Sequence, residues 1–225
     1  MIIFTSLILS LTLYAEPIKI AILDSGYDTK TLDFKQCDNG KLDRDFTSKG
    51  LNDNAGHGNN VLHIITNGLE NVDYCIINIK IINKWADDNL LTYLQGLQYA
   101  SSIEGLNVLN ISLAGNGHND IEVTLINYML NKKVFITAAA GNQGLNLDKD
   151  CKVYPACYDN RIITVGCLKQ NKKNRCELSN YGKYIKTWEV GQNVKAGGYI
   201  LSGTSQATAK MTNNLIKLMW EKRKK

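Results

Sequence analysis

The sequence predicts an α/β fold with three layers, in which a central, mostly parallel β-sheet is covered by helices on both faces. Two observations predict this architecture. Short apolar runs rich in β-branched residues alternate along the chain with amphipathic segments, the order in which parallel strands and crossover helices follow one another. The runs are also almost continuously apolar, which is typical of strands buried on both faces.

Five apolar runs are expected to form the strands, at residues 18–24, 74–82, 107–114, 133–140 and 161–166. Four segments are expected to form helices, at about residues 57–69, 89–102, 120–132 and 205–222. Apolar side chains at helical spacing support three of them. They are Val61, Leu62, Ile65 and Leu69 in the first; Ile121, Leu125, Tyr128 and Met129 in the third, with Asn119 as its N-cap; and Met211, Leu215, Leu218 and Met219 in the last.

The composition is that of a globular protein with one domain. The 225 residues are 44% apolar and 21% charged, with a formal net charge of +5, which excludes a disordered or collagen-like chain. No internal repeat, low-complexity tract or linker marks a second domain. The basic residues at 221–225 lack the interleaved aromatic side chains of single-strand nucleic-acid binders. Cations that stabilise a helix end explain them better, so no nucleic-acid partner is expected.

Residues 1–15 have the features of a secretory signal peptide. They carry no charged side chain, contain a short apolar run and end at the small residue Ala15, and the polar segment that begins at Glu16 follows. The run is too short for a comfortable transmembrane helix. We therefore expect a secreted or periplasmic protein with a single mature domain at residues 16–225 and no stable membrane insertion once the signal is removed. An uncleaved anchor or a buried first strand is the alternative.

Six cysteines agree with export to an oxidising compartment, because an even number can be fully paired. No CxxC pair or histidine-rich cluster offers the spacing of zinc ligands, so disulfides are favoured over a metal site. Six cysteines allow fifteen connectivities, and free structural thiols are a further alternative. One connectivity joins the pairs that are close in sequence and then the two that remain: Cys151–Cys157, Cys167–Cys176 and Cys37–Cys75.

Four polar side chains are expected at the edge of the sheet where ligands bind, beyond the carboxyl ends of the strands. Asp24 ends the first run, Asn142 follows the fourth, and a predicted helix begins at each of His57 and Ser205. Together they supply a nucleophile, a base, a carboxylate that orients the base and an amide donor for an oxyanion. Each residue taken alone could instead be a cap or a turn former.

His57 is the expected base among the three histidines. Gly56 and Gly58 flank it and leave room for a substrate backbone, whereas His63 lies six residues on, away from that face. We expect His63 to be a surface or packed side chain and His118, in a polar turn, to be solvated.

The order of these motifs resembles the subtilisin-like serine proteases, or subtilases. The motifs are DSG at Asp24, GHG at His57, AAAGN at Asn142 and SGTS at Ser205. Three further blocks resemble the family: LNISLAG at 109–115, YPACYDNRIITVG at 154–166 and ELSNYG at 177–182. The resemblance covers nearly the whole chain from residue 18 onward. The G-x-S-x-G elbow of other serine hydrolases does not fit, because Ala207 stands where its last glycine would be.

The resemblance implies a role for each of these residues. Ser205 would attack the peptide carbonyl, His57 would take and return the proton, and Asp24 would orient His57. Asn142, with the backbone N–H of Ser205, would bind the oxyanion. An extended substrate would pair as an added strand with one segment and place the residue before the cut against another: Ser112, Leu113, Ala114 and Gly115, opposite Ala139, Ala140 and Gly141. Small residues in the second segment would leave space for a large substrate side chain.

The resemblance also implies a monomeric endopeptidase that acts on protein or peptide substrates without a cofactor. Only residues 16–23 separate the expected cleavage point from Asp24, so we expect a compact variant without a pro-domain. Trimmed surface loops would remove the calcium sites, and no metal is expected. Three disulfides could then assist the folding of the parallel sheet. Two other functions stay open: a protease-like module that holds a peptide without cleaving it, and a processing protease dedicated to one partner.

Overall fold

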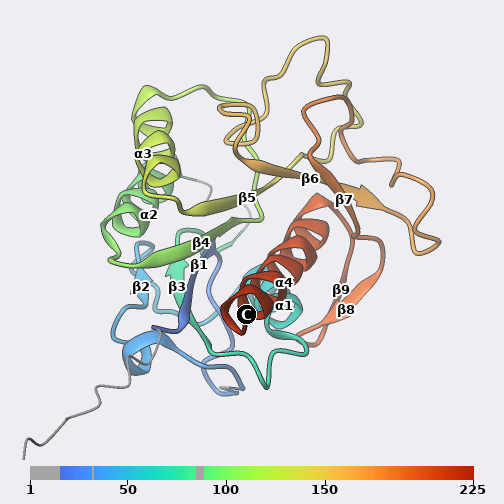
Figure 1. The fold of residues 1–225 in the computed structure, drawn as a ribbon. Helices are drawn as coiled ribbons and strands as arrows, with labels where there is room; N and C mark the ends of the chain where they lie inside the picture. The colour runs from blue at the N-terminus through green and yellow to red at the C-terminus, as the bar shows by residue number, and fades with distance from the viewer. Residues whose placement is uncertain (1–15, 32, 85–88) are drawn as a thin grey trace, which may run out of the picture.

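A seven-stranded parallel sheet lies at the centre of the structure (Figure 1). The structure is a computed structural model that describes residues 16–31, 33–84 and 89–225, so the expected signal peptide lies outside the described residues. Within them the strand order is β2-β3-β1-β4-β5-β6-β7, and all neighbours are parallel. The strands are β1 Ile18–Asp24, β2 Arg44–Asp45, β3 Tyr74–Lys80, β4 Leu106–Ile111, β5 Phe135–Ala139, β6 Ile163–Leu168 and β7 Thr187–Val190.

Helices cover both faces of this sheet, with α2 and α3 on one side and α1 and α4 on the other (Figure 1). The arrangement confirms the predicted three-layer α/β fold. A 3-10 turn and a small antiparallel hairpin complete the described elements. The bounds are α1 His57–Thr66, α2 Leu90–Ser102, α3 Asp120–Asn131, α4 Thr204–Arg223, η1 Cys37–Gly40, β8 Val194–Ala196 and β9 Tyr199–Leu201.

The central strand β1 contributes to a hydrophobic core on each face of the sheet. Ala21 and Leu23 pack in the core beneath α2 and α3, whereas Ile20 and Ile22 pack in the core beneath α1 and α4. Successive side chains of a strand point to opposite faces, so one strand serves both cores. This explains why the run at 18–24 is apolar at almost every position.

Helix α3 buries only part of the predicted face: Met129 is buried and Leu125 packs against the core, as predicted. Asn119 caps it as expected, because its side chain accepts the N–H groups of Ile121 and Glu122. However, Ile121 is 59% exposed and Tyr128 is 49% exposed. The buried face is one residue away, with the spacing i, i+4, i+7 and i+8, and contains an acid: Glu122, Ile126, Met129 and Leu130.

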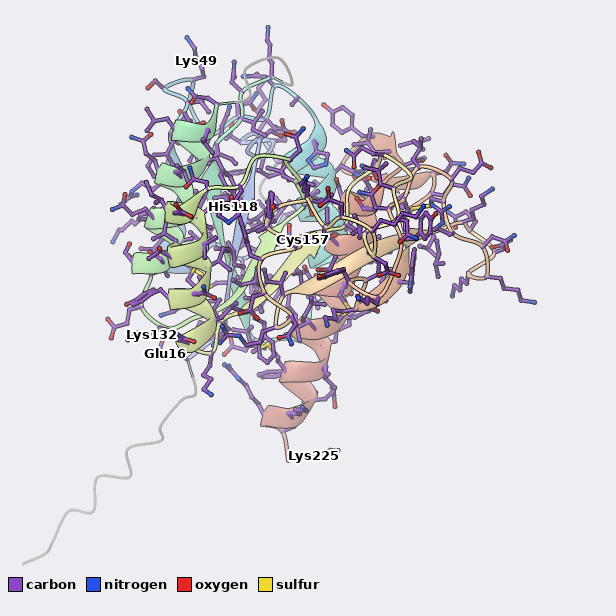
Figure 2. All side chains as sticks on the ribbon, turned by 90° about the horizontal axis from the view of Figure 1, so that it is seen from above. Glu16, Lys49, His118, Lys132, Cys157 and Lys225 are labelled. Carbon is purple, nitrogen blue, oxygen red and sulfur yellow. A yellow bond between two sulfur atoms is a disulfide. The ribbon has the colours of Figure 1, made fainter. Side chains whose placement is uncertain are left out.

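The last turn of α4 is basic and extends beyond the body of the molecule, with Lys225 at its tip (Figure 2). Lys222 and Arg223 lie where positive charge stabilises the negative end of the helix dipole. Leu218, on the predicted apolar face, is 53% exposed, whereas Leu215 and Ile216 are buried. In the described part of the chain no helix has the length and apolar character of a membrane span.

All six cysteines form disulfides, and the pairing is the one that joins close neighbours and then the remaining two. The pairs are Cys37–Cys75, Cys151–Cys157 and Cys167–Cys176. The first ties η1 to β3 and closes the longest loop, so it restricts the unfolded chain most.

The connections that follow the neighbouring strands β1 and β4 run in opposite directions along the sheet. From β1 the chain continues through α1 to β3 on one side, and from β4 through α3 to β5 on the other. Where the connections that follow two neighbouring parallel strands run in opposite directions, a crevice forms at the carboxyl ends of those strands. Ligands of α/β sheets bind in this crevice. Asp24 is the last residue of β1, and Ser112 directly follows β4.

Candidate active site

Asp24 and His57 form a buried, hydrogen-bonded pair. His57 Nδ1 lies 2.7 Å from Asp24 Oδ1, and the two side chains are 6% and 2% exposed. The same oxygen accepts the backbone N–H of Ser25 at 2.8 Å. Because an acceptor stands at Nδ1, that nitrogen carries a proton and Nε2 is the basic nitrogen of the neutral ring.

Burial and charge act in opposite directions on this histidine. Burial by itself lowers the pKa of His57, whereas the charge of Asp24, the hydrogen bond to it and the charge of Asp53 raise it. The net result is that the pKa of His57 lies above its ordinary value of 6.5. The pair therefore makes the imidazole a stronger base than a free histidine.

The start of α1 is held against the end of β1 by backbone contacts that use glycine. The N–H of Gly58 donates to Ser25 Oγ at 2.9 Å. A β-carbon at position 58 would lie 2.3 Å from the carbonyl oxygen of Gly26, so only glycine permits this approach. Asp53 caps the same helix start through the N–H groups of Gly56 and Asn59, both at 2.8 Å. These contacts fix the position of His57 relative to Asp24.

Lys80 supports the loop that precedes α1. It ends β3 beside Asp24 and is fully buried. Its ammonium group donates to the carbonyl oxygen of Gly50 at 2.8 Å and to that of Asn52 at 2.5 Å. A buried ammonium needs such partners, so the loop is held next to the Asp24–His57 pair. A lysine inside an apolar strand gives no sign of this role in the sequence.

Ser205 is the second residue of α4, and that helix start is bonded to two neighbouring segments. Gln206 Nε2 donates to Asn60 Oδ1 at 3.1 Å, which joins the start of α4 to the start of α1. Ser112 Oγ lies 3.1 Å from the carbonyl oxygen of Ser205. The start of α4, the start of α1 and the segment after β4 therefore meet at the carboxyl edge of the sheet.

Asn142 is bonded to Thr204, the residue before Ser205. Asn142 Oδ1 accepts the backbone N–H of Thr204 at 2.9 Å and its hydroxyl at 3.1 Å. The hydroxyl oxygen of Thr204 in turn accepts the N–H of Gly141 at 3.2 Å. With its oxygen engaged in this way, Asn142 has its Nδ2 group left as a donor. The N-terminal N–H groups of a helix are donors of the same kind.

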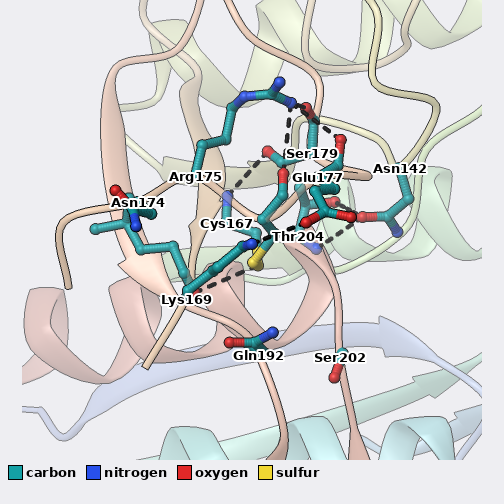
Figure 3. The surroundings of a disulfide bond; sticks show 12 residues. Asn142, Cys167, Lys169, Asn174, Arg175, Glu177, Ser179, Gln192, Ser202 and Thr204 are labelled. Atoms are coloured by element: carbon teal, nitrogen blue, oxygen red, sulfur yellow. Dashed lines mark hydrogen bonds and ion pairs between the residues drawn. A yellow bond between two sulfur atoms is a disulfide. The ribbon is translucent and has the colours of Figure 1, made fainter. Parts of the chain in front are cut away.

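The disulfide Cys167–Cys176 lies near these residues (Figure 3). Cys167 N donates to Ser179 Oγ at 3.0 Å. Cys167 also packs in a small apolar cluster with Ala207, which is two residues after Ser205. The disulfide therefore packs against the start of α4, and the backbone of Cys167 is hydrogen-bonded to Ser179.

A cavity of about 550 Å³ connects Ser205 and Asn142 with the expected substrate segments. Its lining includes six of the residues predicted from the sequence for substrate contact: Ser112, Leu113, Ala114, Gly115, Ala139 and Gly141. Asp24 and His57 are both buried and are not among its lining residues.

Two of the expected substrate residues have other uses in the structure. Gly115 exchanges both backbone hydrogen bonds with Tyr154, at 2.9 and 2.8 Å, so it has no free group to pair with a substrate. Ala140 is fully buried, its carbonyl oxygen accepts Asn180 Nδ2, and it does not line the cavity. Gly115 is therefore already paired within the chain, and Ala140 lies away from the cavity that the other expected substrate residues line. The partner of Gly115 could not be found from sequence alone because Tyr154 is distant along the chain.

The other two histidines lie away from the Asp24–His57 pair. His63 is partly exposed and lies 3.5 Å from the carboxylate of Asp33. The His118 side chain is 54% exposed and contacts the rings of Tyr154 and Tyr158. Among the residues that the structure describes, no group of three His, Cys, Asp or Glu side chains could hold a metal ion.

A buried aspartate bonded to a histidine, with a serine at a nearby helix start, is the arrangement found in serine peptidases. The model of the subtilase family matches residues 16–224. The chain is 27% identical over 204 residues to subtilisin DY of Bacillus licheniformis, which covers 85% of this chain and 72% of that protein. It is 28% identical over 207 residues to thermitase of Thermoactinomyces vulgaris, covering 84% and 70%.

Two solved structures share the fold. A cold adapted subtilisin-like serine proteinase superposes with a TM-score of 0.74 and 20% identity, over 92% of this chain and 76% of that one. A lanthipeptide protease superposes with a TM-score of 0.78 and 20% identity, over 92% and 74%. The chain belongs to the subtilase family, and it is a serine-type endopeptidase.

Proposed function

We propose that this protein is an exported endopeptidase that cleaves peptide bonds through Asp24, His57 and Ser205 and an acyl-enzyme intermediate. The bonded Asp24–His57 pair is the observation that carries the proposal. In the first step His57 Nε2 removes the proton of Ser205 Oγ as this oxygen attacks the substrate carbonyl. The charge of Asp24 stabilises the imidazolium that forms, and His57 then gives the proton to the leaving amine.

The negative charge on the tetrahedral intermediate needs donors that are in place beforehand. We assign this role to Asn142 Nδ2 and the backbone N–H of Ser205. The bonds from Thr204 to Asn142 Oδ1 support the assignment, because they set which end of the amide is available as a donor. The N–H of Ser205 lies in the first turn of α4, where backbone donors have no partner within the helix.

The substrate backbone would lie along Ser112, Leu113 and Ala114 as an added strand. Ala139 and Gly141, across the same cavity, would contact the residue before the cut. Ala139 and Gly141 are small, so they leave space for a large substrate side chain at that position.

The proposal of export rests on the sequence of residues 1–15 and on the three disulfides. We propose that cleavage after Ala15 releases one domain, residues 16–225, into an oxidising compartment. Sequencing the N-terminus of the processed protein after expression in a bacterial host tests this. A mature chain that begins at Glu16 supports it, and a chain retained with residues 1–15 in the membrane contradicts it.

Labelling with a fluorophosphonate probe tests the proposed chemistry. The probe should react with the wild-type protein and not with Ser205→Ala. Ser202→Ala is the matched control, since Ser202 is an exposed serine three positions earlier whose hydroxyl bonds to Asn193. Loss of labelling in Ser205→Ala alone identifies the nucleophile. A folded wild-type protein that never labels would instead favour a module that holds peptides without cleaving them.

A further inference from the structure

The cavity that contains Ser205 also contains a buried carboxylate that the proposed mechanism does not use. Glu122 is 3% exposed and lines the cavity together with Tyr93, Leu113 and Tyr154. It stands in the first turn of α3, on the face that packs against the sheet. An apolar residue would be expected at such a position, and burying an acid there costs free energy unless something compensates it.

Two tyrosines give Glu122 part of this compensation. Tyr93 Oη donates to Oε1 at 2.6 Å, and Tyr158 Oη donates to Oε2 at 2.8 Å. A carboxylate has about four acceptor positions, so each oxygen keeps capacity for one more donor. Tyr158 Oη itself accepts the N–H of Asn119, which holds the cluster to the start of α3.

A positive charge is missing from this arrangement. None of the ion pairs between described residues involves Glu122. The described residues that line the cavity include no Lys or Arg, and the exposed His118 is among them. A cationic ligand that enters the cavity would therefore meet a carboxylate that has no ion-pair partner, and no lining Lys or Arg side chain would compete with the ligand for it.

The walls of the cavity between Ser205 and Glu122 suit the stem of a long side chain. Ile81, Ile82, Leu90 and Leu113 supply apolar surface. Tyr154, another lining residue, stacks on Tyr158 at a centroid distance of 4.4 Å. Long basic side chains bury their methylene groups along such surface while the charged end seeks an acceptor. Aromatic rings also attract cations over their faces.

We propose that Glu122, positioned by Tyr93 and Tyr158, binds a basic side chain of the peptide substrate and makes this enzyme select arginine or lysine at one position on the acyl side of the cut. The inference rests on the proposed function, since it concerns the same cavity. Arginine fits best, because a guanidinium group can donate to both carboxylate oxygens at once. The position is separate from the residue before the cut, which contacts Ala139 and Gly141.

A purely structural role for Glu122 is the alternative, because the two tyrosine bonds also tie α2, α3 and the loop at Tyr158 together. The two roles predict different results. Loss of a structural tie weakens binding of all peptides alike, whereas loss of a charge partner weakens only the binding of cationic peptides. Arginine and citrulline are suitable probes, since their side chains have nearly the same shape and differ in charge.

The experiment places arginine, or citrulline, at each position in turn of an otherwise neutral peptide. Dissociation constants are measured by fluorescence polarisation on the uncleaving Ser205→Ala protein, and kcat/KM on the active protein. At one position we expect arginine to be favoured by about ten- to hundredfold, the range for a hydrogen-bonded charge. Glu122→Gln should bring this ratio close to one, and Asp120→Asn, which removes an exposed acid two residues away, should leave it as in the wild type.

The outcomes separate the two proposals. If the wild type labels with the fluorophosphonate but shows no position with an arginine preference, the charge-partner role of Glu122 is wrong and the protease proposal stands. The same conclusion follows if Glu122→Gln weakens arginine and citrulline peptides equally. If a folded wild type does not label, the protease proposal fails, while the binding ratio on Ser205→Ala still decides the role of Glu122.

Discussion

Two buried carboxylates lie at the carboxyl edge of the sheet, and they differ in what they are bonded to. Asp24 is 2% exposed and accepts hydrogen bonds from a backbone N–H and from His57. Glu122 is 3% exposed and accepts hydrogen bonds from two tyrosine hydroxyls. The two carboxylates are almost equally buried, so the difference between them lies in the groups that donate hydrogen bonds to them.

The donor decides whether the carboxylate takes part in proton transfer. Histidine exchanges a proton near neutral pH, so the charge of Asp24 acts on a base and raises the pKa of His57 against the effect of burial. Burial first, and then the charge of Glu122, raise the pKa of Tyr93 well above 10.0, so that hydroxyl keeps its proton at neutral pH. Glu122 therefore offers a fixed charge to a ligand, whereas Asp24 orients a reacting group.

The largest expected effect comes from Asp24→Asn. The amide removes the charge that stabilises the imidazolium and can hold His57 in the wrong tautomer, so we expect kcat to fall by about 10⁴. The measurement is kcat on a chromogenic peptide, with thermal unfolding to show that the variant is folded. Asp33→Asn is the matched control, because it removes the carboxylate beside His63, a partly exposed histidine. A loss of less than about tenfold in Asp24→Asn would contradict the orienting role.

Asn142→Ala should have the next largest effect. It removes one oxyanion donor that acts mainly in the transition state, so kcat should fall by about 10² to 10³ with little change in KM. Steady-state kinetics on the same peptide measure both constants. Asn131→Ala, which removes an exposed asparagine bonded to Arg161, is the control. A change confined to KM would show that Asn142 binds substrate and does not stabilise the transition state.

The contrast between the two carboxylates also shows what sequence could predict. The strand that ends at Asp24 and the helix that begins at His57 were predictable, because a strand buried on both faces is continuously apolar and its end locates the site. The disulfide pairing agreed with proximity along the chain. These features depend on local patterns or on motifs with known spacing.

Glu122 was not predictable, because apolar periodicity assigns an acid to the exposed face of a helix. Its burial depends on Tyr93 and Tyr158, which come from an earlier helix and a later loop. The hydrogen bonds that occupy the backbone of Gly115 were not predictable either, because its partner Tyr154 is distant along the chain. Short strands such as β7 and β8 were missed because they are only partly buried and contain charged residues.

The smallest expected effect is a pH dependence that distinguishes the two carboxylates in one protein. A general base must be neutral, so kcat/KM should fall as the pH drops through the pKa of His57, with a midpoint above 6.5. In Asp24→Asn the influences of the aspartate that raise this pKa are gone and burial remains. The midpoint of the residual activity should therefore move to lower pH, and an unchanged midpoint would contradict the coupling.

The arginine-to-citrulline ratio of kcat/KM should follow Glu122 instead. Burial raises the pKa of Glu122 above 4.5, opposed by the hydrogen bonds from Tyr93 and Tyr158 and by the charge of His118. The carboxylate is charged above its pKa, so the preference for arginine should be complete at neutral pH and decline as the pH falls through that value. Protonation of His57 slows both peptides equally and cancels in the ratio. A ratio that stayed constant from neutral pH to about 4, or that declined equally in Glu122→Gln, would mean that another group selects the basic side chain.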